Sequence, residues 1–556
     1  MTFALPAAPK LFAAGLGLIV SLMVLPPVVA VVAAAFGRSG AGLEIASVIL
    51  SLIREPAPFT NTLIVGAGGT VLAVAIGGAL ALVLVRTDTP GRFLLEMLVV
   101  LPLYVTPLLT AIAWSWLGSP HAGLINVFLH DALGLHGVVV DLTSAAGVIL
   151  VSALSFVPLP FLLIGSALRG MDPALEDSAR VHGASAFAAL RRITLPLVLP
   201  AILASSLLVF VQAIGAFAVP AVLGMPSNFY VATTEIYQLI EAYPPRLGEA
   251  AAWGLILLVI AAVLTFAQNA LLNRRSYATI TGRNFRPRIL PASGFGYAFA
   301  AAAWLYVALA VGLPVLTLVW AASIRFLTAT PRLMHFSLEH FAFILLQYPK
   351  TYLAAENSML LGAASATLVV VLGLAIGWTT IRTSLPGRSY LDQISMFPLS
   401  LPAMMFAIGL LWVYVGFRLV PIYGTIWILL LAYATQFLPI GVRAASGALR
   451  QLHPELEEAA RVSGASWLQS MHRITLPLTR PTLAAAWVLL FVLAMQEVSA
   501  SILLYSSSST VLSVAAFDLW QGGNPCDLAA LGTLQLAVTF VVVFVLFRLQ
   551  RRSEIA

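Results

Sequence analysis

Long apolar runs, separated by short polar segments, make up most of the chain. Twelve of these runs have the length of about 20 residues that a helix needs to cross a bilayer. They cover residues 11–36, 60–85, 93–117, 144–168, 197–223, 249–272, 296–322, 357–381, 393–416, 424–445, 478–504 and 529–547. The pattern predicts an all-α integral membrane protein with about twelve transmembrane helices.

The composition excludes an ordinary soluble protein. Of the 556 residues, 60% are hydrophobic and 9% are charged, whereas a soluble domain has about 25% charged residues. The single cysteine, Cys526, cannot form an internal disulfide. The first apolar run is too long for the hydrophobic region of a signal peptide, so we expect it to be retained as a span.

The basic residues indicate how the spans are oriented. Twelve spans place both termini on one side of the membrane, and 22 of the 29 Lys and Arg residues then fall on that side. Short loops rich in Lys and Arg stay in the cytoplasm. We therefore expect a multi-pass membrane protein with both termini cytoplasmic. The net charge of +7 is explained by topology, and no nucleic-acid partner is expected.

The chain contains an internal duplication. Residues 86–92 return as residues 382–388, and residues 169–200 return as residues 450–481 with 17 identities in 32 positions. Both copies of each segment fall on the same side, so the repeat is parallel. We expect two six-span halves around a pseudo-twofold axis along the membrane normal. The predicted units are a first half, a cytoplasmic linker rich in Arg, Pro and Gly, and a second half: residues 1–272, 273–295 and 296–556.

Each copy of the longer repeat contains a loop, residues 169–196 or 450–477, that reads as a helix, a glycine break and a second helix; we call them the repeated loops. Pro173 and Pro454 suit the first position of a helix. Gly183 and Gly464 can end that helix with a positive φ, where another residue costs roughly 1–2 kcal/mol. A simple connector needs no such match between the halves. We therefore expect a surface that docks one partner twice.

The second repeated loop resembles the EAA loop of the permeases of binding-protein-dependent ABC importers. It contains Glu458-Ala459-Ala460, then Gly464 six residues after the glutamate, and then Ile474-x-Leu476-Pro477. The first loop departs from this motif by reading Asp177-Ser178-Ala179. Its acid is shortened, which leaves open whether docking is weaker there. In this family the loop forms a coupling helix that sits in a cleft of a cytoplasmic ATPase.

The resemblance covers the whole chain as two fused permease halves. It implies that Glu458 and Asp177 make the acidic contact and that Gly464 and Gly183 supply the break. The candidate coupling residues are Glu176, Asp177, Ala179, Gly183, Glu457, Glu458, Ala459, Ala460 and Gly464. The implied location is the bacterial inner membrane. The implied partners are a cytoplasmic ABC ATPase dimer and a periplasmic or lipid-anchored solute-binding protein, with lipids around the spans.

The chain lacks a nucleotide-binding motif of its own. A P-loop needs a Gly-Lys pair, but the only lysines are Lys10 and Lys350, and Lys350 follows Pro349. No zinc-protease motif, cysteine cluster or nucleophile-base pair falls within the spans, which argues against a membrane-embedded enzyme. We expect a protein that is not an enzyme and carries no cofactor, with ATP and magnesium bound by the separate ATPase.

One acidic residue, Glu497, is predicted deep inside a span. A central charge costs about 3 kcal/mol on insertion scales, so its side chain should face the bundle interior or water. A role in the translocation path and a purely structural role both remain open, and a metal ligand role is unassigned. The other candidate path residues are Gln496, Gln212, Asn61 and Asn357. The two asparagines could equally hold helices together.

Two short segments, residues 233–237 and 513–517, occupy equivalent outer loops. They could form a gate or contact a binding protein, and Tyr237 and Phe517 could instead anchor the chain at the membrane edge.

Within the importer family the chain looks most like the ferric-iron type. The features that suggest it are Gln496-Glu497 before residues 499–504, and residues 234–237 before Pro244-Pro245. Permeases for thiamine, polyamines or phosphonates are the alternatives, because no residue pattern identifies the solute. An ion-gradient-driven secondary transporter also has two parallel six-span halves, but it has no use for the repeated loops.

Overall fold

The computed structural model describes residues 7–39, 42–135, 137–273, 289, 291, 294–328, 335–416 and 421–555. Most of the linker predicted at 273–295 lies outside the described residues. In the described part, nine helices are long and apolar enough to cross a membrane, and three bent pairs raise the number to as many as twelve. Each of these segments overlaps one of the twelve predicted runs. The fold class, an all-α membrane protein built from two similar halves, is confirmed.

The first half contains four of the nine long segments and two of the bent pairs, and the second half contains five long segments and one bent pair. In the first half the long segments are α1 (Ala7–Ala35), α3 (Ala57–Arg86), α10 (Ala186–Ala189) with α11 (Leu195–Ile214), and α13 (Leu247–Asn273). In the second half they are α14 (Gly296–Val307) with α15 (Leu313–Ala322), α17 (Lys350–Arg382), α20 (Ile426–Gln451), α22 (Trp467–Ser470) with α23 (Leu476–Gln496), and α26 (Pro525–Ile555).

Proline bends the third span of each half. Helix α4 (Arg92–Val99), extended by a 3-10 turn, meets α5 (Pro107–Gly118) at 95°, and α18 (Arg388–Met396) meets α19 (Ala403–Gly416) at 109°. The residues before Pro107 and Pro402 have extended ψ angles of 124° and 123°, because proline disfavours the helical conformation at the preceding residue. The fourth span of the first half, α7 (Ala145–Phe156) with α8 (Pro158–Arg169), bends by 45°.

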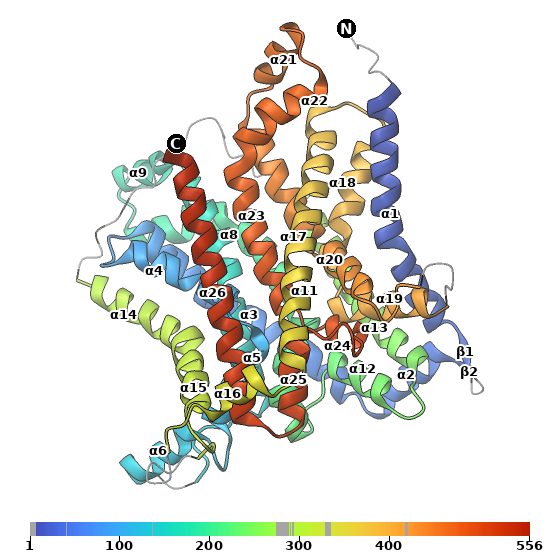
Figure 1. Cartoon of the computed structure of the whole chain (residues 1–556). Coiled ribbons are helices and arrows are strands. Elements are labelled where there is room, and N and C mark those ends of the chain that lie inside the picture. Colours follow the sequence, from blue (N-terminus) through green and yellow to red (C-terminus); the bar gives the residue numbers. More distant parts are fainter. Residues whose placement is uncertain are drawn as a thin grey trace.

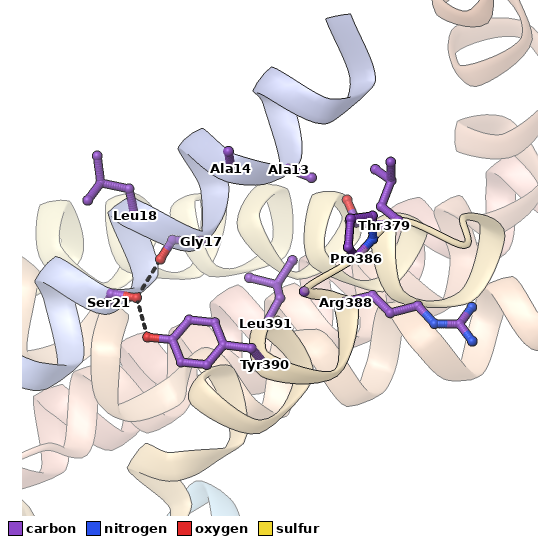
Figure 2. Close-up of a pocket in the computed structure, with 12 residues that line it drawn as sticks. Ala13, Ala14, Gly17, Leu18, Ser21, Thr379, Pro386, Arg388, Tyr390 and Leu391 are labelled. Carbon is purple, nitrogen blue, oxygen red and sulfur yellow. Dashed lines mark hydrogen bonds between the residues drawn. The ribbon is translucent and has the colours of Figure 1, made fainter. Parts of the chain in front are cut away.

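The first span of each half packs against the other half. Helix α1 contacts α13 of its own half and α19 of the second, while α15 contacts α26 of its own half and α5 of the first. An apolar groove of about 480 Å³ lies between α1 and α18 (Figure 2). Across it the Tyr390 hydroxyl lies 2.8 Å from Ser21 Oγ, whose own proton is donated to the Gly17 carbonyl oxygen. The two halves are therefore interlocked.

The helices that follow the fourth spans, α9 (Pro173–Val181) and α21 (Pro454–Val462), lie at the same end of the bundle (Figure 1). The start of α1 and the end of α26 lie there too, and we call this the loop end. The other end carries the small elements β1 (Arg38–Ser39), β2 (Gly42–Leu43), α2 (Glu44–Arg54), α6 (Leu124–Leu133), α12 (Ala232–Glu241), α16 (Glu339–Leu346) and α25 (Leu512–Gln521). We call it the opposite end.

The fifth span of each half is broken at the same place. Helix α11 ends at Ile214 and is followed by an irregular stretch before a π-helical turn at Pro220–Gly224. Helix α23 ends at Gln496, and Glu497 begins an irregular stretch before α24 (Ser501–Leu504). The predicted runs 197–223 and 478–504 are therefore not continuous helices. Such backbone is tolerated at membrane depth only where it is buried in protein or lines a cavity.

Candidate functional site: the repeated loops and the central cavity

Both repeated loops have the predicted helix, glycine break and second helix. Gly183 and Gly464 have φ angles of 85° and 86°, so the positive φ expected at each glycine is confirmed. Ser185 and Ser466 then cap the next helix, because each Oγ accepts a hydrogen bond from the backbone N–H three residues further on, at 3.2 and 3.3 Å. The two loops thus present the same local structure at the loop end.

The four acidic candidates in these loops fall into two kinds. Glu458 is exposed and Asp177 is half-buried. Glu176 and Glu457 are buried, with only 5% and 7% of their surface accessible to solvent. In each loop helix, the acid at the EAA position is therefore more exposed than the acid before it. The acid immediately before it points into the protein.

Each buried glutamate belongs to a small polar cluster that the sequence analysis did not foresee. The two Glu–Arg–Thr clusters are Arg86, Glu176 and Thr194 in the first half and Arg382, Glu457 and Thr475 in the second. Glu176 pairs with the Arg86 guanidinium and accepts a hydrogen bond from Thr194 Oγ1 at 2.5 Å. In the second half, Arg382 Nε lies 3.5 Å from the Glu457 carboxylate, which accepts from Thr475 Oγ1 at 3.0 Å.

The broken segments of the fifth spans line a cavity of about 190 Å³ between the two halves. Three of the predicted path residues, Gln212, Gln496 and Glu497, come together in its wall. Ser152 Oγ and Gln436 Oε1 also lie in the lining and have no hydrogen-bond partner among the described residues. The cavity therefore offers amide, hydroxyl and carboxylate groups that can hydrogen-bond a passing solute.

The Glu497 carboxylate caps the short helix α24. Its Oε1 accepts from the Ala500 N–H at 2.9 Å, and its Oε2 accepts from the Ser501 N–H and hydroxyl at 3.0 and 2.8 Å. Both oxygens thus satisfy backbone donors of a helix start. Among the described residues, no group of three His, Cys, Asp or Glu side chains is arranged to hold a metal ion. This geometry favours the structural role for Glu497.

Asn61 and Asn357 lie outside the cavity wall, towards the opposite end. Asn61 Nδ2 donates to the Tyr230 carbonyl at 2.9 Å, and Asn357 Nδ2 donates to the Ser508 and Thr510 carbonyls at 3.1 and 2.9 Å. Each asparagine therefore ties the second span of its half to the segment before α12 or α25. The structure supports the helix-joining alternative for both.

Three aromatic rings from the two halves pack together next to the cavity. We call Phe217, Tyr237 and Phe517 the aromatic cluster; their ring centroids lie 5.3 to 5.8 Å apart. Phe217 lines the cavity, and Tyr237 and Phe517 are 7% and 0% exposed. This burial contradicts the membrane-edge role for Tyr237 and Phe517. The sequence analysis did not single out Phe217.

Comparison with known proteins agrees with this architecture. The model of the family described as "Binding-protein-dependent transport system inner membrane component" matches residues 69–277 and again residues 358–554. The ferric transport system permease protein FbpB of Actinobacillus pleuropneumoniae is 25% identical over 87% of this chain and 70% of that protein.

Two further relatives differ in their coverage. The probable ABC transporter permease protein y4fN of Sinorhizobium fredii is 28% identical over 94% of this chain and 93% of that protein. The spermidine/putrescine transport system permease protein PotC of Escherichia coli is 30% identical but covers 34% of this chain and 71% of that protein. With two matched copies in one polypeptide, this chain belongs to the family of binding-protein-dependent inner-membrane permeases of ABC importers, as a fusion of two permease halves.

Proposed function

We propose that this chain moves ferric iron into the cytoplasm by alternating access, driven by a separate ABC ATPase dimer. A periplasmic or lipid-anchored binding protein delivers the solute, and ATP and magnesium are bound by the ATPase. The observation that carries the proposal is the pair of equivalent repeated loops at one end of the bundle (Figure 1), in which Glu458 is exposed and Asp177 is half-buried. A twofold ATPase needs two such sites related by symmetry.

The orientation follows from the positive-inside rule. The loop end carries the start of α1, the end of α26 and both repeated loops, and most of the basic residues belong to segments on this side. Short loops with this charge stay in the cytoplasm. We therefore take the loop end as cytoplasmic and the opposite end as the side that faces the binding protein.

The central cavity is the proposed translocation path. The aromatic cluster closes the cavity towards the opposite end. Gln212 also lines the cavity, one helical turn before Ala216 and nearer the loop end, and its side chain is exposed. We take this as a state closed to the outside. ATP binding would draw the loops together and part the aromatic cluster, which lets solute enter the cavity before the outside closes again.

Ferric iron is the preferred solute for two reasons. The ferric permease relative covers most of this chain, and a hard cation favours oxygen ligands such as those in the cavity wall. Since the Glu497 oxygens already accept hydrogen bonds, we propose that iron passes through weak contacts with amide and hydroxyl oxygens. Weak contacts suit transport, because a tightly held ion is not released.

Uptake of radioactive ferric iron tests the proposal. Cells that lack their own ferric importer should accumulate iron only when this chain, its ATPase and its binding protein are produced together. The double variant Asp177→Ala/Glu458→Ala should abolish that uptake. Uptake of thiamine, a polyamine or a phosphonate without iron would overturn the iron assignment, and uptake that persists with an ATPase unable to bind ATP would overturn the ATP-driven mechanism.

A further inference from the structure

The two Glu–Arg–Thr clusters join equivalent segments in both halves, through a hydrogen-bonded ion pair in the first half and an ion pair with a 3.5 Å separation in the second. In each, a buried glutamate of the loop helix, α9 or α21, contacts the arginine that ends the second span, α3 or α17. The same carboxylate accepts a hydrogen bond from the threonine that immediately precedes α11 or α23. The end of the second span, the loop helix and the start of the fifth span therefore meet at one side chain.

Burial makes this connection stiff. The paired side chains are 2% and 7% exposed in the first half and 9% each in the second. Separating a buried ion pair leaves a charge without a partner, which strongly destabilises a protein, so the two groups stay together when the segments move. The loop helix, the end of the second span and the start of the fifth span should thus move as one body.

The fifth spans lead from these clusters to the central cavity. Helices α11 and α23 have 20 and 21 residues, which corresponds to about 30 Å at 1.5 Å per residue. Their far ends are the breaks at Gly215 and Glu497, and both residues line the cavity. A displacement of the loop helix can therefore be carried along the fifth span to the cavity wall.

We infer that Glu176 and Glu457 are positioning residues that transmit the movement of the loop helices to the central cavity. Asp177 and Glu458, one residue further on and more exposed, have the different task of contacting the ATPase. The inference rests on the proposed function, since it requires an ATPase docked on the repeated loops. It assigns a role to the glutamate before the EAA motif, to Arg86 and Arg382 at the span ends, and to the two threonines.

The test removes one hydrogen bond from each cluster in the intact importer. The double variant Thr194→Val/Thr475→Val keeps the side-chain shape and leaves Asp177 and Glu458 unchanged. Spin labels at Glu241→Cys and Asn524→Cys, two exposed positions at the end of α12 and just after α25, report the distance between these two helix ends in a Cys526→Ser background. The importer is reconstituted in lipid bilayers, and this distance is measured with and without ATP and magnesium.

The Val double variant should still co-purify with the ATPase and hydrolyse ATP. The fraction of molecules that show the ATP-dependent distance change should fall by about fivefold or more. The double variant Thr194→Ser/Thr475→Ser restores the hydroxyls and should restore the change. Thr265→Val serves as the matched control, because Thr265 Oγ1 donates only within its own helix, to the Ala261 carbonyl. The single variant Thr475→Val carries the test if the double variant does not accumulate in the membrane.

A full distance change in the Val variants would overturn the inference. A loss that the Ser variants do not reverse would also overturn it, since the hydroxyl would then not be responsible. Failure of the proposed function has a different signature: Asp177→Ala/Glu458→Ala would then retain the ATPase and the distance change. If Asp177→Ala/Glu458→Ala no longer docks the ATPase but the Val variants still move normally, the proposed function stands and only this inference is wrong.

Discussion

Phe217 and Phe517, from opposite halves of the chain, pack with their ring centroids 5.5 Å apart, and neither side chain is exposed. Tyr237 contacts both rings and accepts a hydrogen bond from Gln521 Nε2 at 3.1 Å. At the opposite end the two halves thus meet in an apolar plug of aromatic rings, to which the hydrogen bond between Gln521 and Tyr237 adds a polar contact. It is the part of the interface that must separate if solute enters from that side.

Removing one ring of the plug should make the membrane leak. Phe517→Ala leaves a hole next to Phe217, and a hydrophobic constriction that is widened no longer excludes water and ions, so passive flux should rise about tenfold. The measurement is release of a small trapped dye from liposomes that contain this chain. Phe343→Ala breaks an aromatic pair with Tyr348, remote from the cavity lining, and should not leak. Equal release from both variants would contradict a sealing role.

Replacing the glycine that ends the loop helix should weaken ATPase docking. Alanine at position 464 meets no atom within 4 Å, but the φ of 86° costs a residue with a Cβ roughly 1–2 kcal/mol. We expect Gly464→Ala to lower the amount of ATPase that co-purifies with the chain. Gly447→Ala is the matched control, since that site in α20 is also open and has no positive φ. Its co-purification should equal that of the unsubstituted chain.

Substitution of Glu497 separates capping from solute binding. Glu497→Ala leaves two backbone N–H groups of α24 without their acceptor and should lower the free energy of unfolding by about 1–2 kcal/mol. Glu497→Gln keeps one acceptor and should lose less stability and retain most of the transport. Denaturant unfolding in detergent and iron uptake measure the two effects. Two equally stable variants that both lack transport would instead make Glu497 a solute ligand.

Glu235 in α12 should make stability fall as pH rises. Burial, the largest effect, raises the pKa of its carboxyl above the usual 4.5, although Arg246 partly opposes the shift. The folded protein therefore holds this proton to higher pH than the unfolded chain does, so the free energy of unfolding declines as pH rises from 4.5 through the raised pKa. Glu235→Gln should remove this slope, and the exposed Glu241→Gln should not. Thermal unfolding between pH 4 and pH 8 measures it, and an unchanged slope in Glu235→Gln would exclude this assignment.

Local pattern was sufficient for much of the fold. The apolar runs located the spans, and the duplicated segment located the repeated loops with their positive φ at Gly183 and Gly464. The bends before Pro107 and Pro402 were also encoded locally, since each proline follows another by a few residues, but hydropathy alone does not register a change of direction. The break at Glu497 is hidden for the same reason.

The contacts between distant segments could not be predicted. Arg86 and Glu176 are 90 residues apart in the sequence. The sequence analysis used Arg86 and Arg382 only as basic residues that indicate the cytoplasmic side. A signal was present, because the arginine ends the second span in both halves and the glutamate and threonine recur at one fixed offset. Which carboxylate meets which guanidinium depends on how the helices pack. The same holds for Phe217, whose neighbours come from α12 and α25.

Cross-linking from the repeated loops tests the central claim most directly. Ser178 and Ala459 occupy equivalent, exposed positions in α9 and α21. Each is replaced by cysteine in a Cys526→Ser background and treated with a short thiol-to-amine cross-linker in membranes that contain the whole importer. We predict that both positions attach to the ATPase with similar yield, and that Glu241→Cys at the opposite end does not. Attachment from neither loop, or only from the opposite end, would contradict the account.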